Sequence, residues 1–275
     1  MNTRARFVAL LAVAAILLGA TGCNQLKARD QLNKGVRSYK DAKYEQAIGH
    51  FQQAIVFDDN LKVAKLYLAT AYAQQYVPGV DTPEMTRMAQ QAIGQYKIVL
   101  QNDPQNINSL KGIAYLFMQM KKFDEAREYY TKAIAVDPND PEAYYSVGVI
   151  DWLAAYKDTG DRKAKVGLKV DDELKNKSDQ RVCEDIKANN APRVDEGLKM
   201  LQTATQKRED YDDAMVYLNL LYLRKADMAC NDPQAKAQYK KSSEEFSDKA
   251  MAARKKKAEA AAKKTSGGIV LDQKK

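Results

Sequence analysis

The chain has 275 residues, enough for one or two domains of ordinary size. Apolar residues make up 45% of it and charged residues 29%, a balance typical of globular proteins that argues against a disordered or membrane-embedded chain. The single histidine, His50, removes nearly every His-based catalytic triad and every zinc site that needs several histidines. Only 13 Gly and 7 Pro accompany abundant Ala, Lys and Leu, so the composition favours helices over sheets.

The net charge of +8 is concentrated at the two ends of the chain. Residues 249–275 hold nine basic and two acidic side chains, which give a net charge of +7, and residues 1–22 add +2. Residues 23–248 therefore have a net charge of −1. A neutral body argues against a nucleic-acid-binding face, so we expect no specific nucleic-acid partner.

The first residues have the pattern of a secretory signal. Arg4 and Arg6 precede an apolar run over residues 7–20, which is shorter than the ~20 residues that span a bilayer as a helix. The following Ala20-Thr21-Gly22-Cys23 resembles the lipobox of bacterial lipoproteins. The resemblance implies a signal peptide over 1–22, cleavage before Cys23 and attachment of lipid to its thiol. The alternative is an ordinary signal peptide followed by an incidental cysteine.

Lipidation would determine where the protein resides. Acyl chains contribute about 0.8 kcal/mol per buried CH₂, so several chains anchor a protein permanently. Residues 23–27 would then form a short tether between the lipid and the fold. Asn24 differs from the Asp that serves some enteric lipoproteins as an inner-membrane retention signal. We therefore expect a periplasm-facing lipoprotein of the cell envelope, with the outer membrane favoured over the inner.

Two cysteines remain if Cys23 is lipidated. Cys183 and Cys230 would then be an even number of thiols in an oxidising compartment, where disulfides form and persist. We predict that they form a disulfide, which on the chain-entropy model stabilises the fold by roughly 3–4 kcal/mol. The alternative is a pair of buried free thiols.

Small residues recur along the chain with a spacing of 34, at Gly35 and Ala69, at Ala114 and Gly148, and at Ala92 and Ala126. Small residues at such positions let two helices approach closely, while bulky neighbours fill the adjoining layer. Pro104 and Pro138 each follow a predicted second helix and end it, because proline disfavours a helical residue before it. Most aromatic residues of the repeat are therefore predicted to be core.

The clearest unit runs from Leu110 through Ala114 and Ala126 to Pro138 and resembles the tetratricopeptide repeat, a 34-residue helix–turn–helix unit. The resemblance implies an all-α, right-handed solenoid over residues 28–248, whose first helices line a concave surface. It also implies a binding scaffold without catalysis. Five units are traced, over residues 28–61, 62–106, 107–140, 141–210 and 211–248.

Two insertions and a tail interrupt or follow the repeat. The first insertion, over 75–80, precedes a helix that we expect to start near Asp81–Glu84 with capping-box spacing. The second, over 157–190, is charged in both signs and is either functional or a solvated excursion held by the disulfide. After a polar capping helix, residues 249–275 predict a basic helix with a frayed end, which either contacts anionic lipid or a partner or is simply solvated.

In this family, side chains on the inner face of the first helices contact peptides. Transferring that face by the period gives the predicted groove residues Leu32, Val36, Tyr39, Lys40, Leu66, Thr70, Gln74, Lys111, Tyr115, Met118, Gln119, Tyr145, Val149, Trp152, Leu220 and Arg224. Thr70 and Tyr115 stand where the family's clamp for chaperone tails needs Asn, so we do not expect a chaperone-tail binder. The alternative is that the capping helix, the insertion or the tail covers part of this surface, including Trp152.

No catalytic motif accompanies the repeat. The nucleotide-binding, metalloprotease and nucleophile-elbow patterns are absent from the sequence, and the spacing of the acids singles out no glycosidase-like pair. We predict a scaffold or assembly factor that binds another envelope protein, with no enzyme activity, cofactor or metal. The alternatives are an envelope enzyme or carbohydrate binder around Trp152, favoured by a buried acidic pair in a closed pocket, and a binder of anionic polymer that uses the tail. The sequence leaves the oligomeric state open.

Overall fold

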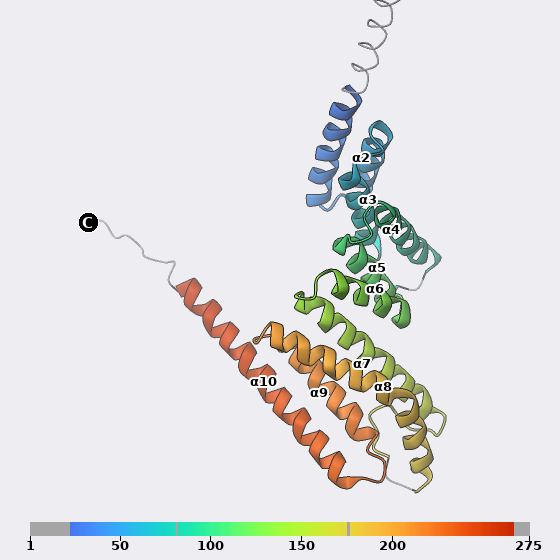
Figure 1. Cartoon of the computed structure of the whole chain (residues 1–275), viewed down its shortest axis with the longest axis vertical. Coiled ribbons are helices and arrows are strands. Elements are labelled where there is room, and N and C mark those ends of the chain that lie inside the picture. The colour runs from blue at the N-terminus through green and yellow to red at the C-terminus, as the bar shows by residue number, and fades with distance from the viewer. Residues whose placement is uncertain (1–22, 81, 175–176, 267–275) are drawn as a thin grey trace, which may run out of the picture. The chain divides into compact units, whose positions relative to one another are not determined.

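The computed structural model describes residues 23–80, 82–174 and 177–266, and this part of the chain consists of helices without a β-strand (Figure 1). The predicted all-α class is therefore confirmed. None of the described helices is long and apolar enough to cross a membrane. The helices are residues 23–40, α2 (Tyr44–Phe57), α3 (Lys62–Gln75), α4 (Pro83–Asn102), α5 (Ile107–Gln119), α6 (Phe123–Val136), α7 (Pro141–Ala164), α8 (Lys177–Lys207), α9 (Asp212–Asp227) and α10 (Pro233–Ser266).

These helices follow one another in the order that the repeat predicts, and they group into two compact units. Unit 1 extends to Lys122 and unit 2 starts at Phe123. The boundary falls between α5 and α6, inside the third predicted repeat. Each unit buries its own core.

In unit 1, every helix packs on the next one in the chain. Helix 23–40 lies against α2, α2 against α3, α3 against α4, and α4 against α5. At Gly35, a Cβ atom would lie only 2.4 Å from Cε1 of Phe51, so no larger residue fits there without a shift. The small residues of the repeat are fully buried at Ala47, Ala69, Ala92 and Ala114. The predicted packing role of these positions is confirmed.

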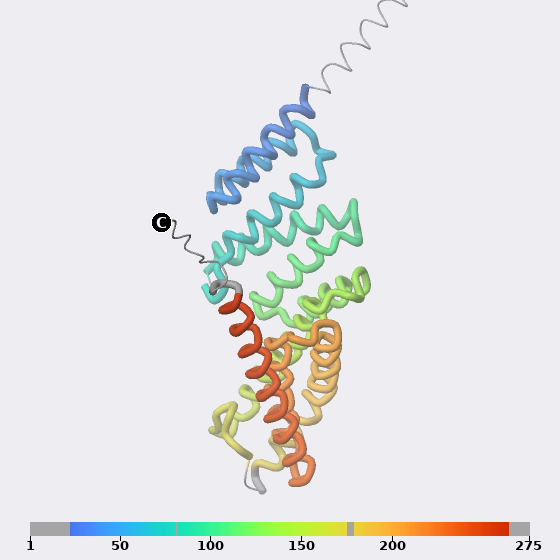
Figure 2. Tube along the Cα trace, turned by 90° about the vertical axis from the view of Figure 1, so that its left-hand side faces the viewer, coloured from blue at the N-terminus to red at the C-terminus, as the bar shows by residue number. Residues whose placement is uncertain are grey.

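In unit 2, α6 packs on α7, α7 on α8, α8 on α9, and α10 runs along α9 (Figure 1 and Figure 2). The tightest approach joins α7 and α8. A Cβ atom at Gly148 would lie 2.4 Å from Cγ of Leu201 and 3.1 Å from the carbonyl oxygen of Gly197. Two facing glycines therefore set the distance between these helices.

Several predicted boundaries differ from the structure. α4 begins at Pro83 as expected, but its N-cap is Thr82, whose Oγ1 accepts from the Met85 N–H at 3.3 Å. Asp81, the predicted cap, lies outside the described residues, as do the predicted signal peptide 1–22 and the end of the tail, 267–275. The predicted tether, residues 23–27, forms the first part of helix 23–40.

The second insertion is shorter than predicted. α7 continues to Ala164, where the ion pairs of Lys157 with Asp161 and of Arg162 with Asp158 support its last turns at i,i+4 spacing. The later part of the predicted insertion is helical, because α8 begins at Lys177, so the described non-helical segment is residues 165–174. Likewise, α10 continues through residue 249 without a break, and the predicted tail begins inside a helix.

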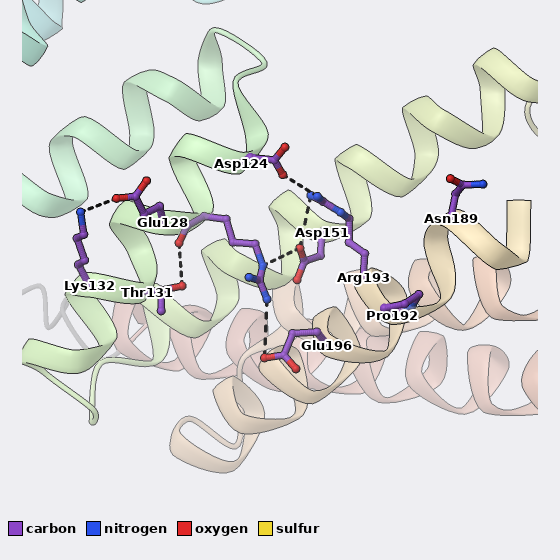
Figure 3. A pocket seen from close by; sticks show the side chains of 10 residues that line it. Asp124, Glu128, Thr131, Lys132, Asp151, Asn189, Pro192, Arg193 and Glu196 are labelled. Atoms are coloured by element: carbon purple, nitrogen blue, oxygen red, sulfur yellow. Dashed lines mark hydrogen bonds and ion pairs between the residues drawn. The ribbon is translucent and has the colours of Figure 1, made fainter.

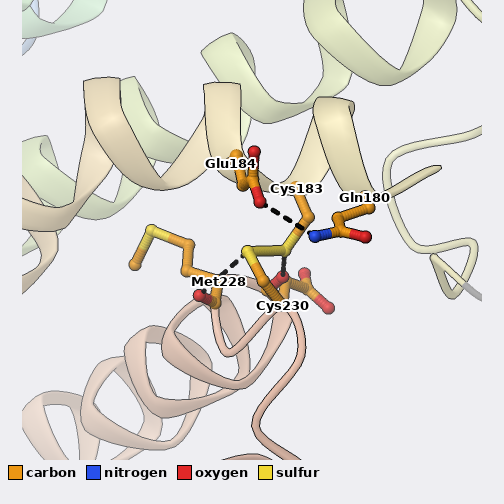
Figure 4. Close-up of a disulfide and its surroundings, with 6 residues drawn as sticks. Gln180, Cys183, Glu184, Met228 and Cys230 are labelled. Carbon is orange, nitrogen blue, oxygen red and sulfur yellow. Dashed lines mark hydrogen bonds between the residues drawn. A yellow bond between two sulfur atoms is a disulfide. The ribbon is translucent and has the colours of Figure 1, made fainter. Parts of the chain in front are cut away.

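The structure contains the predicted disulfide between Cys183 in α8 and Cys230, which lies in the turn after α9 (Figure 4). The two Cα atoms are 5.5 Å apart, a normal separation for a disulfide. Cys23 is exposed and free, which leaves its thiol available for another use. The bond fastens the start of α8 to the end of α9.

The close approach of α7 and α8 at Gly148 and Gly197, which we call the glycine seam, predicts opposite effects on stability for substitutions at two helical glycines. Gly148→Ala should lower the free energy of unfolding by about 1–3 kcal/mol, because the added methyl group overlaps Leu201. Gly94→Ala is the matched control, since a Cβ atom there meets nothing within 4 Å and alanine favours the helix by about 0.5–1 kcal/mol. Urea unfolding of both variants measures the difference, and equal effects of the two substitutions would contradict the seam.

Candidate protein-binding surface

One face of α7 presents predicted groove residues at helical spacing. Asp140 caps this helix, since its Oδ1 accepts from the Glu142 N–H at 2.9 Å, and Pro141 occupies the first helical position. Tyr145, Val149 and Trp152 follow at i, i+4 and i+7, which places them on one side of the helix. The local sequence thus determines that these residues share a face.

A row of four aromatic rings follows this face. It consists of Tyr145, Trp152 and Tyr156 from α7 and Tyr217 from α9, and all four are half-buried. Ring centroids are 5.7 Å apart for Tyr145–Tyr217, 5.3 Å for Trp152–Tyr217 and 5.1 Å for Trp152–Tyr156. We call this set the aromatic row. Rings held by each other on rigid helices, with part of their surface exposed, have the properties of interface anchors.

Carboxylates surround the Tyr145 end of the row. Glu142 accepts from the hydroxyl of Tyr211 at 2.6 Å and from Nη1 of Arg208 at 2.7 Å. Burial raises the pKa of Tyr145 well above its ordinary value, and Tyr217, Asp213 and Glu142 raise it further. The phenol therefore stays neutral beside these carboxylates.

The other end of the row is basic and covered. The Arg224 guanidinium lies over the Tyr156 ring, with Cζ 5.6 Å from its centroid, but the side chain is buried beneath the second insertion. Val149 is also buried. These two predicted groove residues are not open to a partner in this structure, because the insertion and the core take up their side chains. Trp152, by contrast, keeps part of its surface exposed.

Unit 1 brings some of the predicted residues together. The Tyr39 ring lies edge-on to Tyr67, with centroids 6.3 Å apart, and its hydroxyl is hydrogen-bonded to the side chain of Gln74. Thr70 accepts a hydrogen bond from the hydroxyl of Tyr96 at 3.3 Å. These contacts join the first helices of the first two pairs and α4.

The remaining predicted residues of unit 1 are more dispersed. Tyr115 is 43% exposed, Lys40 is exposed and Lys111 is half-buried. Gln119 lines a pocket of about 140 Å³ together with residues of the first insertion, among them Tyr76. Because the predicted groove residues are divided between two units, their joint action on one partner stays a prediction.

Sequence reasoning missed a charged cleft of about 760 Å³ in unit 2 (Figure 3). Asp151 of α7 lies at its base, and Oδ1 is 3.1 Å from Nε of Arg127 in α6 and 3.9 Å from Nη1 of Arg193 in α8. Three helices thus meet at one carboxylate. The cleft is lined by Asp124, Arg127, Glu128, Thr131, Lys132, Asp151, Asn189, Pro192, Arg193 and Glu196.

The position of Asp151 is a departure from the repeat. The pattern has tyrosine three residues after the small residue of the first helix, and this chain has Asp151 three residues after Gly148. Its side chain is fully buried, and burial raises its pKa to about 6 although Arg127 and Arg193 lower it. A mismatch with the pattern was the signal in the sequence that could have revealed this cluster.

The cleft does not have the arrangement that would favour an enzyme. It is open, and its buried acid is a single carboxylate between two arginines, not an acidic pair. Asp227, a half-buried acid, belongs to a separate cluster with Lys163 and Arg224. Among the described residues, no group of His, Cys, Asp or Glu has the arrangement of a metal site. The arrangement that would favour an enzyme, a buried acidic pair in a closed pocket, is therefore not the arrangement of this cleft.

The buried carboxylate predicts an unusual pH dependence of stability. Because the pKa of Asp151 is raised from 3.8 to about 6, the folded state keeps a proton that the unfolded state has already lost. The contribution of Asp151 to stability therefore falls as the pH rises through this window and is constant above it, a change of up to about 3 kcal/mol.

Asp151→Asn removes this titration. The unfolding free energy of the variant minus that of the wild type should rise between about pH 4 and pH 6, measured by urea unfolding. Asp161→Asn, at an exposed acid of the same helix, serves as the control and should change by only a few tenths of a kcal/mol. A difference that does not vary with pH would show that Asp151 is ionised throughout.

Comparisons with known proteins agree with this architecture. Residues 107–140 match the family model of the tetratricopeptide repeat. No curated protein matches the chain in sequence. The family match and the succession of helices together give the chain a tetratricopeptide-repeat fold.

Solved structures with a similar fold cover most of the chain. The structure of MamA from Desulfovibrio magneticus RS-1, from residue 41 to its end, has 15% sequence identity and a TM-score of 0.57, and the alignment covers 84% of this chain and 96% of that one. A crystal structure of MamA protein has 13% identity and a TM-score of 0.56, with 85% and 94% covered. At these identities the likeness concerns the fold alone.

Proposed function

We propose that this tetratricopeptide-repeat protein is a scaffold that binds another protein through the aromatic row of unit 2. The observation that carries the proposal is the row itself, four half-buried rings fixed by mutual contacts on α7 and α9. Such rings offer a large contact area and lose little conformational entropy on binding. The repeat fold supports a role in protein–protein interaction over catalysis.

The aromatic contact between the long last helix and α9 does not involve the row. α10 meets α9 through Phe246, which stacks on Tyr222 with ring centroids 5.7 Å apart. Tyr222 is five residues after Tyr217 and hence roughly 140° around the helix from it. This aromatic contact therefore lies on another side of α9 than the row, whereas Arg254 of α10 reaches Asp213 near the Tyr217 side.

We further propose that the protein resides in the bacterial cell envelope, anchored by lipid on Cys23 and facing the periplasm, in the outer membrane in preference to the inner. The lipobox-like Ala20–Cys23 supports this proposal. An exposed, unpaired Cys23 and a disulfide between Cys183 and Cys230 are what a lipidated protein in an oxidising compartment would have. The partner would then be a protein of the envelope.

The alternative function, binding of an anionic polymer through the basic tail, is less well supported. Arg254 and Lys257, two of its basic residues, form ion pairs with Asp212 at the start of α9, and Arg254 also pairs with Asp213. Part of the positive charge is thus used inside unit 2. This leaves fewer cations for an anionic polymer than the sequence suggests.

Substitutions in the row test the proposed binding. The wild-type partner is first identified by crosslinking in membranes and mass spectrometry. Tyr145→Ala combined with Tyr217→Ala should then weaken binding of that partner at least 30-fold, because hot-spot residues contribute about 2 kcal/mol or more. Tyr129→Ala on α6 is the control, since it removes a half-buried tyrosine of the same unit outside the row. Equal affinity of the folded double variant and the wild type would refute binding by the row.

The lipid anchor has its own test. Cells grown with an alkyne-bearing fatty acid should label the wild-type protein, and Cys23→Ser should abolish the label because the acceptor thiol is lost. Cys183→Ser, which leaves Cys23 in place, should remain labelled. Label that persists in Cys23→Ser, or a wild-type protein without label, would show that the protein is not a lipoprotein at this residue.

A further inference from the structure

A short segment of the second insertion lies across the basic end of the aromatic row. We call residues 168–172 the strap. Lys163, whose side chain is fully buried, donates from Nζ to the carbonyl oxygens of Val170 at 2.7 Å and of Asp172 at 2.8 Å. The strap is therefore held through its main chain.

Arg224 makes the second set of contacts with the strap. Its Nη2 is 3.2 Å from Oδ1 of Asp171, and its Nη1 donates to the carbonyl oxygen of Val170 at 3.5 Å. The same guanidinium lies over Tyr156, the last ring of the row. The strap thus contacts Arg224 at the end of the aromatic row that Tyr156 forms.

The charges beneath the strap require an anion. Lys163 and Arg224 are two cations, and within this cluster they share the carboxylate of Asp227, whose Oδ2 is 3.0 Å from Nη1 of Arg224 and 3.8 Å from Nζ of Lys163. Without the strap, the cluster would keep one excess positive charge and donors without acceptors. Asp171 supplies the charge and the strap carbonyls supply the acceptors. An extended acidic peptide would meet the same requirement.

The strap is fastened near both of its ends. Lys163 holds it beside the end of α7, and Nζ of Lys240 in α10 is 3.0 Å from Oε1 of Glu173 on the other side. The disulfide between Cys183 and Cys230 ties α8, the helix that follows, to the end of α9 (Figure 4). A segment fixed in this way is a permanent local competitor, because its effective concentration is set by the chain.

We propose that Lys163 and Arg224 form a binding site for an extended acidic peptide segment, and that the strap is its resident occupant. The inference rests on the proposed function and adds the chemistry of the partner. A partner segment would lie along the aromatic row with an acidic residue at Arg224. Its other end would lie beside Glu142 and Asp213, whose carboxylates are already paired with Arg208 and Arg254.

The strap itself supplies the probe. A synthetic peptide of residues 166–174, Val-Gly-Leu-Lys-Val-Asp-Asp-Glu-Leu, is titrated into the full chain and into a full-chain variant with residues 166–174 replaced by a Gly/Ser linker of equal length. Binding is followed by fluorescence anisotropy of the labelled peptide and by the emission of Trp152, the sole tryptophan. The linker variant should bind at least 10-fold more tightly than the wild type.

Two substitutions separate specific binding from general attraction. A peptide with Asn in place of Asp171 should bind the linker variant at least 10-fold more weakly, because it loses a charge-assisted hydrogen bond. Arg224→Gln in the linker variant should have the same effect. Lys225→Gln is the matched control, since this adjacent cation pairs with Asp195 instead, and it should leave the affinity unchanged.

A linker variant that does not fold would be replaced by Asp171→Asn in the intact chain. This smaller change should speed amide hydrogen exchange over residues 168–172 and permit binding of the wild-type peptide. Failure of the peptide to bind either folded variant, or equal binding of the Asp and Asn peptides, would overturn the inference. If the partner's affinity still depended on Tyr145 and Tyr217 in that case, the strap would be structural and the proposed function would stand.

Discussion

The close approach of paired helices at small residues is the constraint on which the rest of the structure depends. Gly148 faces the backbone of Gly197, and Gly35 faces the Phe51 ring, at distances that leave no room for a Cβ atom. Helices packed at this distance have little freedom to shift, because interior packing is dense. Gly197 likewise brings α8 close to α9, since a Cβ atom there would lie 2.9 Å from Cδ1 of Leu221, so α7 and α9 are rigid supports for the side chains on their exposed face. The aromatic row is an outcome of this rigidity.

Charge marks one end of that surface. The carboxylates at its Tyr145 end are paired with Arg208, Arg254 and Lys257, whereas the Lys163–Arg224 cluster at the other end is held beneath the strap. A cationic cluster at one end favours the orientation of an extended partner that places its acidic residue there. Hydrophobic contact alone would not make this distinction. The insertion therefore contributes to recognition as well as to the stability of unit 2.

Asp151 shows how a repeat can depart from its own pattern. A carboxylate occupies a position that the repeat fills with tyrosine, and arginines from α6 and α8 approach it. Removing either arginine would leave a buried charge with less compensation, which is costly. The cluster thus links three consecutive helices through one interaction that an apolar residue could not make.

The sequence by itself determined the helix pairs, the shared face of Tyr145 and Trp152, and the pairing of Cys183 with Cys230, because these depend on spacing along the chain and on the number of thiols. The tertiary structure alone decided the burial of Arg224, which bonds a carbonyl 54 residues away. It also decided that arginines from two other helices reach Asp151, and that α7 and α8 extend into the predicted insertion. Such contacts join segments without a common period, so no local pattern reports them.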